Sequence, residues 1–178
     1  MPQPSPPKHP LTYATATALL TRFDAAEIAQ RVDRGVPRLV TSQLMTDVAA
    51  AADLSAYTAA EVARAQAGLL VINRALQDAD DTINGYISAR YTLPVNPVPA
   101  VLQRVACELA RFYLYDDQVT DLIKDRHASN IKWLGEVSKG TVSLGADAAT
   151  GVQPVSSAGA ELVTGGKVWG RESSTGFI

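Results

Sequence analysis

The chain has 178 residues, which is enough for one domain with a real core and accessory segments but not for two full domains. Hydrophobic residues make up 47% of the chain and aromatic residues only 6%, and much of the apolar share is alanine, which favours helices packed through small side chains. The formal charge of -2 argues against a protein that wraps nucleic-acid phosphates. We therefore predict a mainly α fold: a small helical bundle with one long helix and extended N-terminal and C-terminal arms.

The first 14 residues are predicted to form the extended N-terminal arm. Five of the first ten residues are proline, and the stretch has no apolar region of the kind found in secretory signals. Residues 15–33 then carry apolar side chains at loosely helical spacing, and Asp24 is placed to cap a helix that begins at Ala25. Two short helices are predicted in this range.

Residues 35–57 are predicted to form a loop with one helical turn through Met45 to Ala52. A long helix is predicted to follow, from Ala59 to Arg90. Thr58 and Glu61 have the T-x-x-E spacing of a capping box. Apolar positions then recur at steps of three and four, in a seam formed by Val62, Ala65, Leu69, Ile72, Leu76, Ala79, Ile83 and Tyr86. Such a helix would be about 50 Å long. Because that exceeds what a core of this size needs, part of it is expected to protrude or to meet a neighbour.

Three prolines end the long helix. Pro94, Pro97 and Pro99 lack the amide donor that a helix needs, so they predict an elbow of fixed geometry. Pro99 also suits the first turn of a following helix, which is predicted from Ala100 to Tyr115. That helix is broadly apolar, so we expect it to lie at the centre of the fold.

A last helix is predicted from Asp117, which can act as its cap, to Gly140, which suits the left-handed conformation after a helix end. Residues 141–178 hold seven glycines and too little apolar surface for a core of their own. They are expected to form an extended C-terminal arm that partners order. The chain thus divides into the N-terminal arm, a helical domain over residues 15–140, and the C-terminal arm.

Catalytic and ligand-binding patterns are not found in the sequence. Metal binding needs several His, Cys or carboxylate ligands, but the chain has only two histidines and one cysteine. Cys107 is expected to be a buried thiol. His127 is expected to be a structural or interface residue. The stretch "TGGKV" lacks the glycine spacing and the Ser or Thr of a phosphate loop. Asp80 and Asp81 are expected on a solvated polar helix face. We therefore expect no enzyme activity, no cofactor and no metal, and no stretch is apolar for long enough to span a membrane.

Arg90 and Tyr91, at the end of the long helix, are candidate interface residues. Arg, Tyr and Trp are concentrated in the energetic centres of interfaces, although a surface salt bridge with local packing explains the pair equally well. Trp133 and Trp169 raise the same question. Trp169 raises it more sharply, because it lies in an otherwise polar tail where an exposed indole calls for a partner that buries it.

Several stretches also follow a recognisable order of motifs. The run "ALQDADDTINGYISARYTLPVNPVPAVLQRVACELARFYLY" contains D-A-x-x-x-I-x-G-Y, A-R-Y-x-L-P and a V-P that opens a helix. It is followed by "IKWLGEVSKGTVSLG" and by the ending "KVWGRESSTGFI", and "LTYATATALLTRFDAAEIAQ" precedes it. Together these stretches resemble the head-tail connector, or head completion, proteins of Mu-like tailed bacteriophages. Relative to that pattern, residues 35–57 look like an inserted loop.

The resemblance implies a structural head-tail connector subunit without catalytic activity. Such a subunit forms a ring with copies of itself, a dodecamer, docks on the portal protein, extends the DNA channel and offers a platform to the next neck or tail-terminator protein. DNA is expected to pass through without specific binding, and the implied place is the virion neck, assembled in the host bacterial cytoplasm. The candidate contacts to the portal or to a neighbouring subunit are Arg90, Tyr91, Trp133, Trp169, Arg171 and Phe177.

The main alternative is a cytosolic helical interaction or regulatory module that binds a partner through the same apolar seam without a role in the virion. Whether the protein co-purifies with intact particles separates the two hypotheses. An enzyme is a third possibility, which no nucleophile, metal or phosphate-binding pattern supports.

Overall fold

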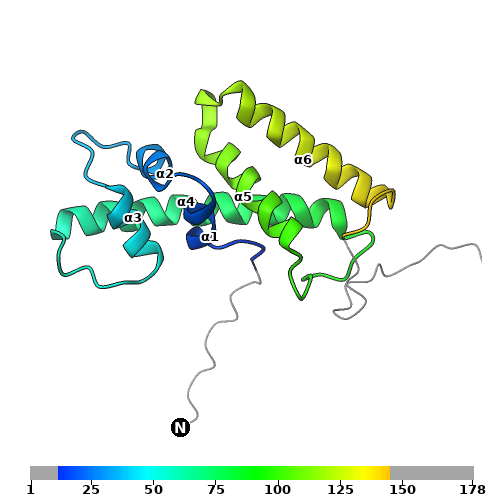
Figure 1. Cartoon of the computed structure of the whole chain (residues 1–178), viewed down its shortest axis with the longest axis horizontal. Coiled ribbons are helices and arrows are strands. Elements are labelled where there is room, and N and C mark those ends of the chain that lie inside the picture. Colours follow the sequence, from blue (N-terminus) through cyan, green and yellow to red (C-terminus); the bar gives the residue numbers. More distant parts are fainter. Residues whose placement is uncertain (1–11, 145–178) are drawn as a thin grey trace, which may run out of the picture.

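The computed structural model describes residues 12–144, which form a bundle arranged around one long helix (Figure 1). Within these residues there are six α-helices, one 3-10 turn and no strand. The elements are α1 (Ala16–Arg22), α2 (Ala25–Val32), α3 (Ser42–Ala49), α4 (Ala59–Ile87), α5 (Ala100–Tyr115), η1 (Asp116–Gln118) and α6 (Asp121–Lys139). The prediction of a mainly α fold with one long helix is confirmed. Most of the two predicted arms falls outside the described residues.

Polar side chains start the helices where the sequence predicts it. The Asp24 carboxylate accepts a hydrogen bond from the Ala26 N–H at 2.9 Å, at the start of α2. At the start of α4, the Thr58 hydroxyl accepts from the Glu61 N–H at 3.3 Å, and the Glu61 carboxylate accepts from the Thr58 N–H at 2.8 Å. The capping box therefore forms as predicted, and it satisfies two amides that the helix itself leaves free.

Residues 35–57 contain the helix α3, so the prediction of a loop with a single turn is wrong. The Thr41 hydroxyl caps α3 by accepting from the Leu44 N–H at 3.2 Å. α3 packs on α2 and α4 and buries Leu44, Met45 and Val48. The predicted turn began too late because it overlooked the cap at Thr41. The segment contributes to the core of the domain.

The start of α6 also differs from the prediction. Its N-cap position is Thr120, not Asp117, and the η1 turn separates it from α5. Asp116, which follows α5, has a φ of 51°, so the chain turns away before a new helix can begin. The predicted end is confirmed, because Gly140 adopts a left-handed conformation with a φ of 83° after the last turn of α6.

α4 is covered on one side along its whole length. The seam positions Ala65, Ile72, Leu76, Ala79 and Ile83 are all buried, because α2 and α3 pack near the first turns of α4 while α5 and α6 pack on its other half (Figure 1). These seam positions therefore do not protrude beyond the core, and the expectation that part of the long helix meets a neighbour stays a prediction. The short helices before α4 fold back over it and supply the cover that a shorter bundle would lack.

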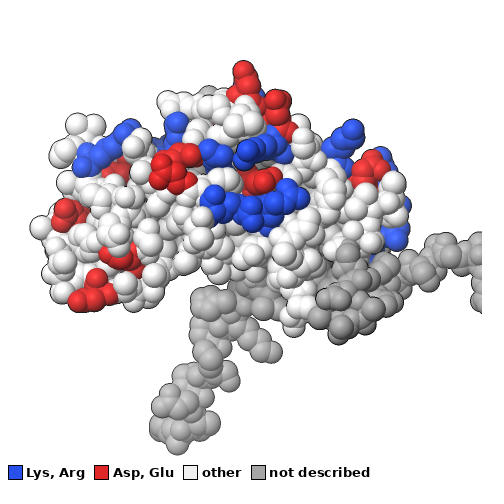
Figure 2. Space-filling model, in the orientation of Figure 1, with Lys and Arg blue, Asp and Glu red and all other residues white. Residues whose placement is uncertain are grey.

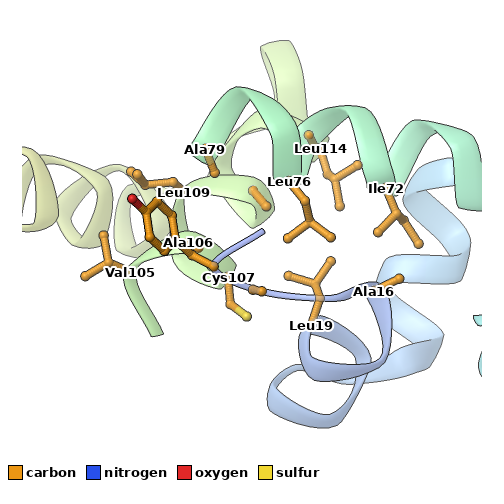
Figure 3. Packing of buried hydrophobic residues seen from close by; sticks show 14 of the residues in the cluster. Ala16, Leu19, Ile72, Leu76, Ala79, Val105, Ala106, Cys107, Leu109 and Leu114 are labelled. Atoms are coloured by element: carbon orange, nitrogen blue, oxygen red, sulfur yellow. The ribbon is translucent and has the colours of Figure 1, made fainter. Parts of the chain in front are cut away.

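The core lies where α1 and α5 meet α4. Figure 3 shows Leu19 of α1 pointing toward Leu76 of α4, with Cys107 of α5 beside them. Leu19, Leu109 and Cys107 are fully buried, and burial raises the pKa of the Cys107 thiol to about 11. The predicted central position of α5 and the predicted buried thiol are both confirmed. Among the helices of residues 12–144, none is both long enough and apolar enough to cross a membrane.

Candidate interaction surfaces

The elbow between α4 and α5 packs against the subunit's own core. Tyr91 is only 3% exposed, and Val95 is buried beside it in the same core cluster. The Tyr91 hydroxyl oxygen accepts a hydrogen bond from the Leu144 N–H at 3.2 Å, so it fastens the segment after α6 to the elbow. An interface role for Tyr91 stays a prediction, and its burial leaves little of the side chain for a neighbouring subunit.

Arg90 lies beside the end of α6. A Cβ atom on Gly140 would collide with the Arg90 guanidinium, which shows how closely the two residues pack. A cation is favourable at this position because the last carbonyls of a helix carry partial negative charge. The Nε of Arg90 is buried and finds no hydrogen-bond acceptor among the described residues. The half-buried side chain thus packs between the elbow and the end of α6, and its interface role stays a prediction.

Trp133 belongs to a row of side chains along the outer side of α6. Its ring packs partly on the core, while Leu122 is 59% exposed and Arg126 and Ser129 are exposed. Positions separated by four, three and four residues lie on one side of a helix. We call this row, Leu122, Arg126, Ser129 and Trp133, the α6 stripe.

A second row lies on the outer side of α4, opposite its buried seam. Leu70 is 71% exposed and Val71 is 46% exposed, and Arg74 and Asp78 are exposed on the following turns. We call these four residues the α4 stripe. The sequence reasoning missed this row, although Leu70 and Val71 fall outside the three-and-four spacing of the seam, which is the signal that could have found it.

Charged side chains of both signs gather across the middle of the face shown in Figure 2. The Arg111 guanidinium donates two hydrogen bonds of 2.8 Å to the Glu27 carboxylate. Arg104 lies 3.5 Å from the Glu108 carboxylate. Arg111 and Arg104 each therefore have an acidic partner at close range.

Asp80 holds the segment before α1 against α4. It is only 3% exposed, and its carboxylate accepts a hydrogen bond from the Tyr13 N–H at 3.2 Å, while the Tyr13 hydroxyl donates to Asn84 at 2.5 Å. Burial raises the pKa of Asp80 to about 6, the charge of Asp81 adds to the rise, and the bond from Tyr13 opposes it. The prediction of a solvated position holds for Asp81 and is wrong for Asp80, because the chain before α1 covers that turn of α4.

Asp33, at the end of α2, also holds a neighbouring segment through a buried carboxylate, and it accepts more hydrogen bonds than Asp80 does. Its buried carboxylate accepts from the backbone N–H groups of Gly35, Leu39 and Val40 at 3.0, 2.7 and 3.0 Å, and from the Arg64 guanidinium at 2.9 Å. Burial alone would raise the pKa of Asp33, but these donors outweigh it and lower the pKa to about 2. This clamp fixes the segment between α2 and α3 on α4. It was not predicted.

His127 is partly buried against α5. Its ring stacks on Phe112 with 3.8 Å between ring centroids, and burial lowers its pKa, so it has the structural place that the sequence predicts. Among residues 12–144, no three His, Cys, Asp or Glu side chains come together in a way that could hold a metal ion. The predicted contact residues Trp169, Arg171 and Phe177 lie outside the described residues.

Comparisons with known proteins identify the family. The family model described as Bacteriophage Mu, Gp36 matches residues 13–162. A Mu-like prophage FluMu protein gp36 of Haemophilus influenzae is 41% identical over 108 residues, which cover 60% of this chain and 75% of the relative. Gene product J of Escherichia phage Mu is 35% identical over 101 residues, which cover 57% of this chain and 72% of the relative. The chain, with its long α4, its proline elbow and its capped helices, therefore belongs to the Bacteriophage Mu Gp36 family.

Proposed function

We propose that this protein is a structural head-tail connector subunit of a tailed phage virion. In this proposal its copies form a ring that docks on the portal protein, extends the DNA channel and offers a platform to the next neck or tail-terminator protein. The subunit would take its place in the virion neck after assembly in the host bacterial cytoplasm. Membership in a phage Mu family supports the phage origin, and the order of sequence motifs supports the connector role.

The single observation that carries the ring is the presence of two different exposed rows on one folded body. The α4 stripe and the α6 stripe each combine a large exposed aliphatic side chain with a charged residue. A closed ring of identical subunits needs two different surfaces on each subunit, because the contact runs head to tail. Interfaces of this kind typically have an apolar centre and a polar rim.

The anchored chain ends support the portal contact. Tyr13 is hydrogen-bonded to Asp80 and Asn84 near the end of α4, and Leu144 is hydrogen-bonded to Tyr91 just after the end of α4. The segments that continue beyond these anchors, residues 1–11 and 145–178, would engage the portal or an adjacent subunit, and Trp169 is the side chain most in need of a partner. The mixed charges of Figure 2 fit a channel through which DNA passes without specific binding.

Deletion of the gene in a phage that carries it tests the proposal. The expected result is DNA-filled heads and finished tails that do not join, with infectivity restored by the wild-type gene supplied in trans. Mass spectrometry of purified wild-type particles should find the protein in a fixed ratio to the portal protein. A chain truncated after Gly145 should still fold, because the described core ends at Leu144, but it should fail to restore infectivity.

Two results would contradict the proposal. One is the formation of complete, infectious particles without the protein. The other is its absence from purified particles, which would favour the alternative of a cytosolic interaction module.

A further inference from the structure

Resting on the ring proposed above, we propose that neighbouring subunits meet through the two stripes. The α6 stripe of one copy lies antiparallel on the α4 stripe of the next copy. The occupant of each stripe is thus a second copy of this chain, and the contact is heterologous, so it can repeat around a ring.

The spacing of the two stripes matches. Trp133 and Arg126 are two helical turns apart on α6, and Val71 and Asp78 are two turns apart on α4; each separation is about 10.5 Å along its helix. In an antiparallel arrangement Trp133 covers Val71 while Arg126 meets Asp78. Each apolar side chain then has an apolar partner and each of these charges has an opposite one.

The flanking residues fit the same register. Ser129 and Arg74 fall between the two matched pairs, and a serine hydroxyl can accept a hydrogen bond from a guanidinium. Leu70 lies next to Val71 and widens the apolar surface under Trp133, while Leu122 lies one turn beyond Arg126 and shields its ion pair from water.

The two stripes cannot pair within one subunit. α4 and α6 do pack on each other inside the bundle, where Ile83 on α4 and Leu134 and Val137 on α6 are fully buried in the same core cluster. Leu70 and Leu122 stay exposed in that arrangement. A second copy supplies what one copy cannot reach.

Disulfide trapping with the full-length protein tests the contact. One preparation carries Arg74→Cys and a second carries Ser129→Cys, which leaves the proposed anchors Val71 and Trp133 in place; Cys107 is fully buried and stays unchanged. The two preparations are mixed at high concentration and oxidised. The expected product is a dimer linked between positions 74 and 129, identified by mass spectrometry. Ala52→Cys, at an exposed site that belongs to neither stripe, replaces Arg74→Cys as the matched control and should give at least about tenfold less product.

A charge exchange tests the predicted register. Asp78→Arg or Arg126→Glu alone should lower the yield of the linked dimer at least about tenfold, because like charges then face each other across the contact. Both changes together, each in its own preparation, should restore the yield. Both residues are exposed, and circular dichroism of each variant verifies that the helices are intact.

The outcomes separate this contact from the connector role. Absence of the linked dimer both in solution and in purified particles, or a charge exchange that fails to restore it, overturns the contact. If the dimer forms but particles lack the protein, the contact stands and the connector role falls. If particles contain the protein and Ser129→Cys is shielded there by portal or DNA without a link to position 74, the α6 stripe has another occupant and the proposal is wrong.

Discussion

Asp80 should make the protein less stable as the pH rises from about 4 to about 6. Its pKa is raised from 3.8 to about 6 in the folded chain. Between these values the folded state keeps a proton that the unfolded state has already released, so raising the pH favours unfolding. A difference of about two pKa units corresponds to about 3 kcal/mol of unfolding free energy lost by pH 7, at about 1.4 kcal/mol per unit.

Replacing Asp80 with asparagine removes the charge and keeps a carbonyl oxygen that can accept from the Tyr13 N–H. Urea unfolding measured from about pH 4 to pH 8 should show that Asp80→Asn gains stability over the wild type as the pH rises, by up to about 3 kcal/mol at neutral pH. Asp81→Asn makes the same charge change at an exposed position; because the charge of Asp81 only adds to a rise that burial dominates, this variant should keep most of the wild-type loss of stability with pH, slightly reduced. The difference between the curves also removes the contribution of His127, whose lowered pKa acts in the opposite direction. Identical curves for the two variants would refute the reasoning.

Three further substitutions test the contacts that hold the domain together. Arg64→Gln removes one hydrogen-bond donor from the buried carboxylate of Asp33. We expect the free energy of unfolding, measured in urea at neutral pH, to fall by about 2 kcal/mol, and the protein to unfold in acid at a higher pH than the wild type. An unchanged pH of acid unfolding would contradict the role given to the Asp33 hydrogen bonds. Tyr91→Phe removes the acceptor of the Leu144 N–H, which should lower the free energy of unfolding by about 1 kcal/mol and speed hydrogen exchange at the Leu144 amide. Equal protection of that amide in the variant and the wild type would show that the hydrogen bond does not hold the segment. Gly140→Ala places a Cβ at a left-handed position and should lower stability by about 1 kcal/mol in thermal or urea unfolding, and a neutral effect would argue against the left-handed end of α6.

The helices could be predicted because their start and stop signals are local. Asp24, Thr58 and Glu61 act within one turn of chain, and Gly140 ends α6 through its own backbone conformation. The seam of α4 was also readable, because a repeating spacing of three and four residues has one structural explanation when a core is available. α3 was missed because its cap at Thr41 was overlooked, although α2, a helix of the same length, was predicted from its cap at Asp24.

The burial of the carboxylates could not be predicted in this way. Whether Asp80 or Asp81 meets water depends on the chain before α1, which lies far away in sequence and covers only one of them. Tyr91 likewise has the composition of an interface residue, and only the fold shows that its hydroxyl is engaged by Leu144.

The two anchors at the end of α4 also determine how the molecule carries mechanical load. A pull on the chain before Tyr13 reaches the turns around Asp80 and Asn84, and a pull on the chain after Leu144 reaches the elbow at Tyr91. Tension applied at either end is therefore expected to reach the last turns of α4 and the elbow that follows them.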